Sequence, residues 1–95
     1  MILSIHLPQD LRARLPRVAS AILALVHGRP RPDKFVLVTL PLASGTLAAA
    51  LGLAPETFSR SISHMVAEGV LHRLSPRRYQ VLDLRRLTLL AQSPD

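Results

Sequence analysis

The chain has 95 residues, enough for one small domain with a single hydrophobic core. Its 12 Lys and Arg outnumber its 6 Asp and Glu, a basic excess that is typical of a nucleic-acid-binding domain. A GC-rich codon bias would explain arginine in place of lysine, but not this excess. The absence of cysteine excludes disulfides, thiolate metal sites and cysteine nucleophiles from this chain. No apolar run approaches the roughly 18 residues of a membrane span, and the first residues lack signal-peptide features, so a cytoplasmic location is expected.

The first part of the chain predicts two helices, a loop and a strand. Leu7–Leu15 is a short helical candidate, and Pro16 is expected to begin a second helix because proline suits the first helical position. The second helix carries an apolar stripe with helical spacing, at Val18, Ile22, Leu25 and Val26. Glycine and two prolines in residues 28–33 predict a loop, and the apolar residues 35–40 predict a strand.

Residues 42–69, LASGTLAAALGLAPETFSRSISHMVAEG, predict two short helices joined by a sharp turn at Gly52. The second helix is expected over residues 55–68. Its apolar residues fall on one helix face, at Phe58, Ile62, Met65 and Val66. Two short helices joined in this way are typical of a helix-turn-helix, whose second helix lies in the DNA major groove.

The polar face of this second helix offers groups that suit base edges. At about 100° per residue, four polar side chains share an arc of about 100° on this face: Glu56, Ser59, Arg60 and Ser63. Arginine can donate two hydrogen bonds to guanine, a carboxylate can accept one from cytosine, and serine can do either. We therefore predict that Glu56, Ser59 and Arg60 read bases. The plainer interpretation is a surface pair of Glu56 with Arg60, and both interpretations can hold together.

The last part of the chain predicts a hairpin and a helix. Leu71–Leu74 and Arg78–Leu82 flank Ser75-Pro76-Arg77, which is a hairpin signal, and Leu84–Gln92 predicts a final helix. Three arginines near the hairpin tip are predicted to contact DNA phosphates: Arg73, Arg77 and Arg78. The alternative is a tip that carries charge only because it is solvated. The order helix, strand, helix, helix, hairpin predicts a winged helix-turn-helix, mainly α with a small β-wing (α+β).

Further side chains are predicted to contact the DNA backbone: Ser44, Thr57, Ser63 and His64. Thr57 and His64 flank the reading face, at about 100° and 80° from Glu56 around the helix. The four histidines show no metal-ligand spacing, so no metal site is expected. Ser59 and His64 lack an orienting acid and no glycine elbow is present, so the chain is not expected to be an enzyme.

The run LPLASGTLAAALGLAPETFSRSISHMVAEGVLHRL resembles the DNA-binding domain of the Crp/Fnr transcription regulators. The likeness covers roughly residues 16–92. It rests on Leu-Pro-Leu at 40–42, Leu-Ala at 47–48, Leu-Gly at 51–52, Glu-Thr-Phe-Ser-Arg at 56–60, Val-Leu at 70–71 and Tyr-Gln-Val-Leu-Asp-Leu at 79–84. The pentad at 56–60 is the most specific of these.

The resemblance also implies which bases are read. The trio Glu56, Ser59 and Arg60 is similar to the Fnr-type pattern, which reads half-sites of the TTGAT kind. The Crp-type pattern has arginine at the position of Pro55 and glycine at that of Ser59, and this chain has neither. The expected function is therefore Fnr-type base reading.

The chain departs from the family before each helix of the helix-turn-helix. Ala43 and Ala54 stand where the family often has Ser or Thr, and the loss of such a cap costs about 1 kcal/mol. Pro55 compensates in part as a first-turn residue. Ser44 is expected to cap the first helix in place of Ala43.

The resemblance also implies a domain organisation. Residues 1–15 are expected to be a lead-in, either the remnant of a linker or dimerisation region or an artificial start, 16–92 the winged-helix domain, and 93–95 a tail. Crp/Fnr regulators carry an N-terminal sensor domain and a long dimerisation helix, for which the lead-in is too short. The chain is expected to be either the output domain of a longer regulator or a naturally short relative. It is expected to hold no cofactor, with any effector bound by the absent sensor domain.

The leading hypothesis is sequence-specific binding of double-stranded DNA by the output domain of a bacterial regulator. RNA polymerase is a further candidate partner of the complete regulator, and no membrane partner is expected. No heptad run is present, so we expect the isolated domain to be a monomer and the complete regulator a homodimer. The alternative is a winged helix that contacts another protein. Such surfaces favour aromatic and aliphatic side chains, which the polar face of residues 56–63 lacks.

Overall fold

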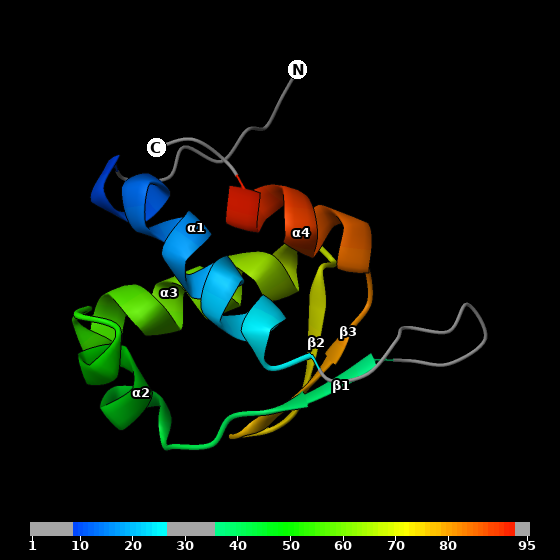
Figure 1. The fold of residues 1–95 in the computed structure, drawn as a ribbon, viewed down its shortest axis with the longest axis horizontal. Coiled ribbons are helices and arrows are strands. Elements are labelled where there is room, and N and C mark those ends of the chain that lie inside the picture. The colour runs from blue at the N-terminus through cyan, green and yellow to red at the C-terminus, as the bar shows by residue number, and fades with distance from the viewer. Residues whose placement is uncertain (1–8, 27–35, 93–95) are drawn as a thin grey trace.

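The computed structural model describes residues 9–26 and 36–92, which form four helices and a three-stranded antiparallel sheet (Figure 1). The elements follow in the order α1 (Gln9–Ala24), β1 (Val36–Thr39), α2 (Ser44–Ala50), α3 (Pro55–Ala67), β2 (Leu71–Ser75), β3 (Arg78–Val81) and α4 (Leu84–Gln92). This order confirms the predicted winged helix-turn-helix. Three predicted parts lie outside the described residues: most of the lead-in, Phe35 at the start of the predicted strand, and the tail. The division into lead-in, domain and tail therefore stays a prediction.

The first helix is longer than the sequence predicts. The expected break at Pro16 is wrong, because α1 is a single helix with this proline inside it. An interior proline removes one helical hydrogen bond and costs about 3 kcal/mol. Leu15 and Val18, on either side of the proline, are both buried in the core. Packing on both sides of Pro16 therefore offsets the cost and keeps the helix continuous.

The hydrophobic core lies between the helices and one face of the sheet. In Figure 1, α1 lies against α4 and α3, and α3 also packs against α2 and β2. Fully buried side chains come from several of these elements: Ile22 of α1, Leu40 after β1, Phe58 and Met65 of α3, Leu71 of β2 and Leu87 of α4. α3 is thus held from several sides. Within residues 9–26 and 36–92, no helix combines the length and apolar character needed to cross a membrane.

Each helix of the helix-turn-helix is followed, two residues after its last residue, by a glycine with a left-handed backbone. Gly52 has φ of 73° and Gly69 has φ of 77°, a conformation that glycine adopts without steric cost. The amide of Leu53 donates to the carbonyl of Ala48 at 2.8 Å, which closes the end of α2. This turn confirms the predicted corner between the two helices and fixes the direction in which α3 leaves it.

The hairpin of β2 and β3, here called the wing, has an irregular register. The strand order is β1-β3-β2, so β3 pairs with both neighbours. Tyr79 on β3 lies opposite Val38 on one side and Arg73 on the other. The register then shifts between Arg73 and Ser75, which leaves Leu74 as an extra residue in β2. Such a bulge bends a strand and changes the aim of its neighbouring side chains.

Candidate nucleic-acid interface

The second helix of the helix-turn-helix, α3, presents one buried and one exposed side, as its spacing predicts. Pro55 stands in its first turn, where its missing amide hydrogen is not needed. Phe58, Ile62 and Met65 are buried against the core. Ser61 is also buried, and its hydroxyl donates to the carbonyl of Thr57 at 2.9 Å, so no polar group is left without a partner there. Burial of this side leaves the opposite side of α3 free for a ligand.

The exposed side of α3 carries the predicted base-reading residues. Glu56, Ser59 and Arg60 are all exposed. A carboxylate oxygen of Glu56 lies 3.6 Å from a guanidinium nitrogen of Arg60, and the two side chains remain 77% and 61% exposed. A pair this exposed is worth little to folding and separates easily when a ligand arrives. The pair and a role in base reading are therefore compatible, as the sequence indicates.

The backbone-contacting residues predicted on α2 and α3 lie around this face. Ser63 is exposed, while Thr57 and His64 are half-buried. Ser44 is exposed at the start of α2, but its predicted role as helix cap is wrong. Ala43 is the cap residue and makes no side-chain hydrogen bond, because the helix already begins at Ser44. Ser44 thus lies one position too far along the chain for its hydroxyl to cap the helix.

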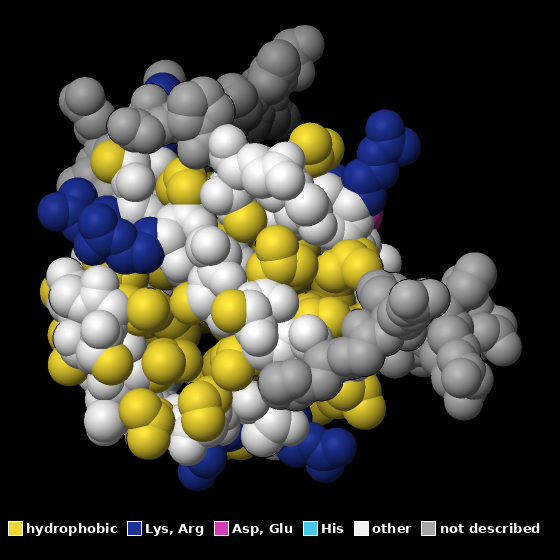
Figure 2. All heavy atoms as spheres, in the orientation of Figure 1, with side chains coloured by type: hydrophobic (Ala, Val, Ile, Leu, Met, Phe, Trp, Pro, Cys, Tyr) yellow, Lys and Arg dark blue, Asp and Glu magenta, His cyan; other side chains and the backbone are white. Residues whose placement is uncertain are grey.

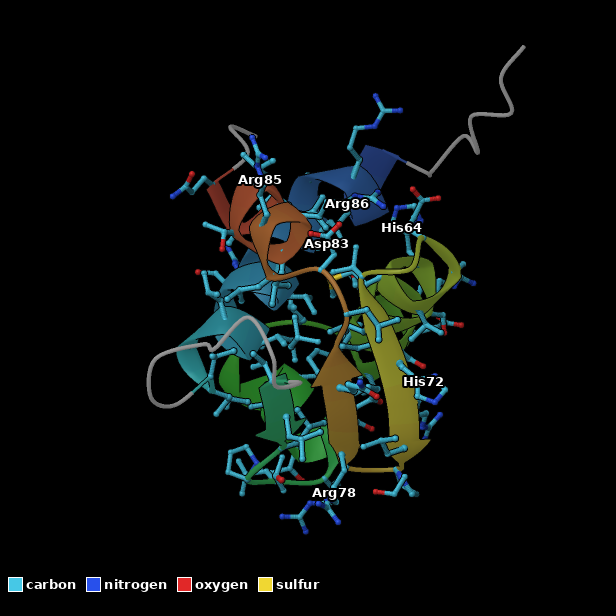
Figure 3. The ribbon with its side chains drawn as sticks, turned by 90° about the vertical axis from the view of Figure 1, so that its right-hand side faces the viewer. His64, His72, Arg78, Asp83, Arg85 and Arg86 are labelled. Carbon is cyan, nitrogen blue, oxygen red and sulfur yellow. The ribbon has the colours of Figure 1, made fainter. Side chains whose placement is uncertain are left out.

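The three arginines of the wing have different environments. Arg78 is exposed at the wing tip and points away from the protein in Figure 3. Arg73 donates from Nε to the carbonyl of Ser75 at 3.4 Å, a long hydrogen bond within its own hairpin. Arg77 is bound more firmly, because its Nε donates to the carbonyl of Leu40 and its Nη2 to the carbonyl of Pro41, both at 3.0 Å. The sequence pattern treats the three alike, and the structure does not.

The contacts of Arg77 join the wing to the segment that leads into α2. Besides its two side-chain bonds, its own carbonyl accepts a 2.7 Å hydrogen bond from the amide of Leu40. Three hydrogen bonds therefore link the wing turn to the end of β1. Hydrogen bonds from a charged donor are stronger than neutral ones. The guanidinium of Arg77 consequently helps to set the position of the wing relative to the helix-turn-helix.

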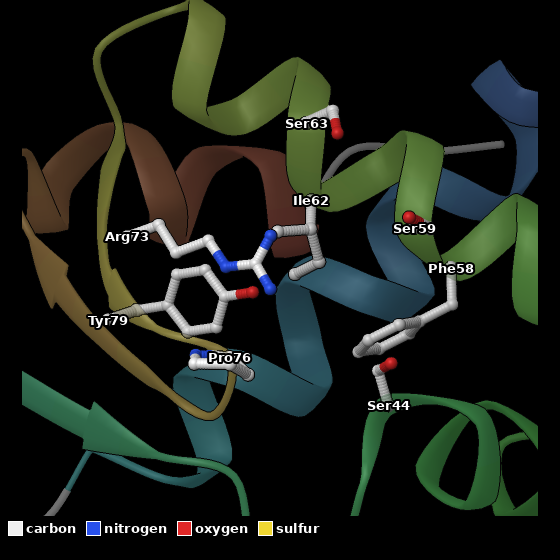
Figure 4. Close-up of a pocket in the computed structure, with 8 residues that line it drawn as sticks. All are labelled: Ser44, Phe58, Ser59, Ile62, Ser63, Arg73, Pro76 and Tyr79. Carbon is white, nitrogen blue, oxygen red and sulfur yellow. The ribbon is translucent and has the colours of Figure 1, made fainter.

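A small hollow lies between α3 and the wing. Its volume is about 50 Å³, and its lining combines predicted contact residues with core residues: Ser44, Phe58, Ser59, Ile62, Ser63, Arg73, Pro76 and Tyr79 (Figure 4). The structure thus brings Ser44, Ser59, Ser63 and Arg73 around one space. Tyr79 is a residue that sequence reasoning missed. The only signal was the alternation of its strand, which marks it as a core residue and says nothing of its hydroxyl.

A family model described as a Crp-like helix-turn-helix domain matches residues 16–90. The chain belongs to this family. Crp-like domains are the DNA-binding domains of Crp/Fnr transcription regulators, which confirms the family that the sequence resembles. Among curated protein sequences, none matches this chain.

Solved structures of family members are similar in fold. The catabolite activator protein of Thermus thermophilus is 30% identical with a TM-score of 0.66, and the match covers 87% of this chain and 36% of that protein. A second protein of that bacterium, a transcriptional regulator of the Crp/Fnr family, is 26% identical with a TM-score of 0.62, covering 90% and 42%. The CO-dependent transcription factor CooA of Carboxydothermus hydrogenoformans is 25% identical with a TM-score of 0.66, covering 87% and 37%. The chain therefore spans about two fifths or less of the length of these relatives.

Two arginines outside the exposed face of α3 hold the ends of the helices in this Crp-like domain. Arg86 donates to the carbonyl of Glu68 at 2.8 Å and to its carboxylate at 3.1 Å, which ties α4 to the end of α3. Asp83 accepts the amide of Arg86 at 3.0 Å, and Figure 3 shows these two residues at the opposite end of the wing from Arg78. Arg17 of α1 donates to the carbonyl of Leu51 at 3.4 Å. Part of the basic charge of the domain therefore supports the fold.

The remaining basic charge is unevenly spread over the surface of the Crp-like domain. On the face shown in Figure 2, hydrophobic and uncharged atoms fill the middle, and the described Arg side chains stand in separate groups at its edge. The middle of this face therefore offers little positive charge to a nucleic acid. The predicted contact residues lie instead on the polar surface formed by α3 and the wing.

Proposed function

We propose that this Crp-like domain is the sequence-specific DNA-binding part of a bacterial transcription regulator. Its helix α3 would read a TTGAT-like half-site through Glu56, Ser59 and Arg60. One observation carries the proposal: these three side chains share the exposed side of a helix whose other side is buried. The chain acts by binding rather than by catalysis, and it needs no cofactor of its own.

The chemistry of each residue suggests its role in the complex. Arg60 donates two parallel hydrogen bonds to one guanine, and Glu56 accepts a hydrogen bond from a cytosine at a neighbouring pair. Ser59 donates or accepts according to the base it meets. The alternative, a winged helix that contacts a protein, is less well supported because these three exposed side chains are all polar.

Backbone contacts surround this reading face. We propose that Ser44, Thr57, Ser63 and His64 contact phosphates beside α3, and that Arg73 and Arg78 contact phosphates beside the wing. The sequence predicts Arg77 as a third phosphate contact of the wing. Its bonds to two carbonyls support a different main task, which is to hold the wing in place.

The complete regulator has further expected properties. We propose that it is a homodimer in the cytoplasm, where it meets chromosomal DNA, and that RNA polymerase is a partner of the DNA-bound form. Any effector binds a sensor domain outside the residues of this chain. These properties concern the complete regulator, because the chain spans only about two fifths or less of the length of its relatives.

Selection of bound sequences from random double-stranded DNA tests the proposal. The experiment uses the 95-residue chain at low salt, because phosphate contacts dominate affinity and weaken as salt rises. We expect enrichment of a TTGAT-like half-site. Retention of all DNA without enrichment would contradict base reading. No retention at any salt concentration would favour the protein-contacting alternative.

A further inference from the structure

The hollow between α3 and the wing has the chemistry of an anion site. Its lining includes the guanidinium of Arg73 and the hydroxyls of Ser59, Ser63 and Tyr79, but no carboxylate. The nearest acidic residue along α3, Glu56, does not line it. Its volume of about 50 Å³ exceeds the roughly 10–15 Å³ that one water needs, so it has room for a group of several heavy atoms.

The hydroxyl of Tyr79 lines this hollow and has no hydrogen-bond partner among residues 9–26 and 36–92. The residue is only 4% exposed, so its ring belongs to the core. Within the described part of the chain, no buried side-chain oxygen or nitrogen lacks a hydrogen-bond partner. The Tyr79 hydroxyl forms no hydrogen bond with any of those residues. It is therefore not one of the buried atoms, and it is accessible at the hollow although its ring is buried. In Figure 4 it points into the space beside the guanidinium of Arg73.

The register of the wing explains why these two groups meet. Arg73 and Tyr79 are opposite residues of β2 and β3, and opposite residues share one face of a sheet. The bulge at Leu74 follows directly and changes the direction of the strand. Only Nε of Arg73 has a partner among the described residues, at 3.4 Å, so its two terminal nitrogens can donate to a ligand.

We propose that this hollow is the seat of one phosphate of the DNA backbone. The Tyr79 hydroxyl donates to one phosphate oxygen, the Arg73 guanidinium neutralises the charge, and the Ser63 hydroxyl donates from α3. The proposal rests on the proposed function and adds Tyr79 to its contacts. A phosphate fixed between α3 and the wing sets how deeply α3 enters the groove, without itself reading sequence.

Neutral phosphate analogues in the DNA test the seat. Methylphosphonates replace one phosphate at a time in the selected half-site, and binding is measured for the unmodified chain, Tyr79→Phe, Arg73→Ala and Arg78→Ala. Tyr79→Phe keeps the buried ring and removes only the hydroxyl. It should weaken binding about tenfold on every sequence, as expected for one hydrogen bond to a charged group.

The coupling between variant and analogue decides the result. A methylphosphonate at one position should weaken DNA binding by the unmodified chain. At that position it should weaken binding by Tyr79→Phe and Arg73→Ala much less, because these variants have already lost the same contact. Arg78→Ala is the matched control and should keep the full effect at that position. Equal effects of every methylphosphonate on all four proteins would overturn the seat and leave the proposed function standing. A chain with no DNA binding would overturn both.

Inorganic phosphate distinguishes a DNA phosphate from a free anion. The chain has one tyrosine and no tryptophan, so its intrinsic fluorescence reports Tyr79 alone. We expect no saturable change with phosphate up to about 0.1 mM, because a single ion lacks the other contacts of the DNA and is bound no tighter than about millimolar. Saturation at lower concentration, without coupling to any DNA phosphate, would assign the hollow to a free anion and overturn the proposal.

Discussion

The exposed side of α3 and the wing are both polar surfaces, but their charges are used differently. On α3, Arg60 pairs with Glu56, one turn away on the same helix, and both side chains remain exposed. On the wing, Arg77 is bound to carbonyls beyond β1, while Arg78 at the tip points away. Residues on α3 are thus free to meet a ligand, whereas an arginine on the wing can be part of the fold. Counting basic residues in a motif therefore overestimates the charge available to DNA.

Removal of the Phe58 side chain, which holds α3 against the core, should have the largest effect of the changes considered. Phe58 is 1% exposed and packs the helix against the core. We expect Phe58→Ala to lower the free energy of unfolding by about 3–5 kcal/mol, through lost burial and the cavity left behind. Urea unfolding followed by circular dichroism measures this change.

The matched control is the exposed neighbour of Phe58. Ser59→Ala should change the free energy of unfolding by less than about 0.5 kcal/mol, while it alters DNA binding. Similar losses of stability for both variants would show that the exposed side of α3 also supports the fold. The distinction between a free and a structural surface would then fail.

Joining two copies of the chain into a dimer should distinguish base reading by α3 from the backbone contacts of the wing, because each α3 of the dimer reads its own half-site. We expect the unfused chain to be a monomer that binds DNA at micromolar concentration or weaker near physiological salt, close to the non-specific range. Fusion of a dimerising coiled coil before Met1 should tighten binding by about 10² or more on a two-half-site palindrome. The gain on a single half-site should be much smaller.

Sedimentation and titration on both DNAs provide the measurement. A stable dimer of the unfused chain would contradict the expected monomer. Equal gains on the palindrome and on the single half-site would mean that the wings and other backbone contacts, rather than paired α3 helices, account for the affinity.

The two arginines at the wing tip should separate structure from binding. Arg77→Ala should lower the free energy of unfolding by about 1–2 kcal/mol, because it removes hydrogen bonds to the carbonyls of Leu40 and Pro41. Arg78→Ala should leave stability unchanged and reduce the salt dependence of DNA binding by about one unit of slope. Thermal unfolding and binding at several salt concentrations distinguish them.

The reverse pattern would contradict this division. If Arg77→Ala changed only the salt slope, its bonds to the carbonyls would be of no consequence and it would be an ordinary phosphate contact. If both variants left the slope unchanged, the wing would not lie in the interface.

Most of α3 could be predicted from the sequence because helical spacing alone decides which side faces the core. The spacing predicts a helix over residues 55–68, and the structure has Pro55–Ala67, with Phe58, Ile62 and Met65 buried. Local rules failed where distant contacts decide the outcome. Packing on both sides of Pro16 keeps α1 continuous against the preference of proline.

The wing was harder to predict in detail, although its hairpin was expected. The pairing of Arg73 with Tyr79 depends on a register that includes a bulge, and no residue pattern in the sequence predicts this bulge. The bonds of Arg77 reach residues more than thirty positions earlier in the chain. A hairpin places its side chains through such pairing, so the sequence shows which charges are present but not which of them are free.

The most direct test of base reading by α3 is the effect of Arg60→Ala on specificity. Binding is measured on the selected half-site and on a scrambled sequence of the same length, for the unmodified chain, Arg60→Ala and Glu56→Ala. Arg60→Ala should cost about 1–3 kcal/mol on the half-site, flatten the preference at one G·C pair and change binding to scrambled DNA far less. Glu56→Ala should relax the preference at a neighbouring pair more than it weakens binding. Equal losses for Arg60→Ala on both DNAs would show that it contacts only phosphate, and would contradict base reading by α3.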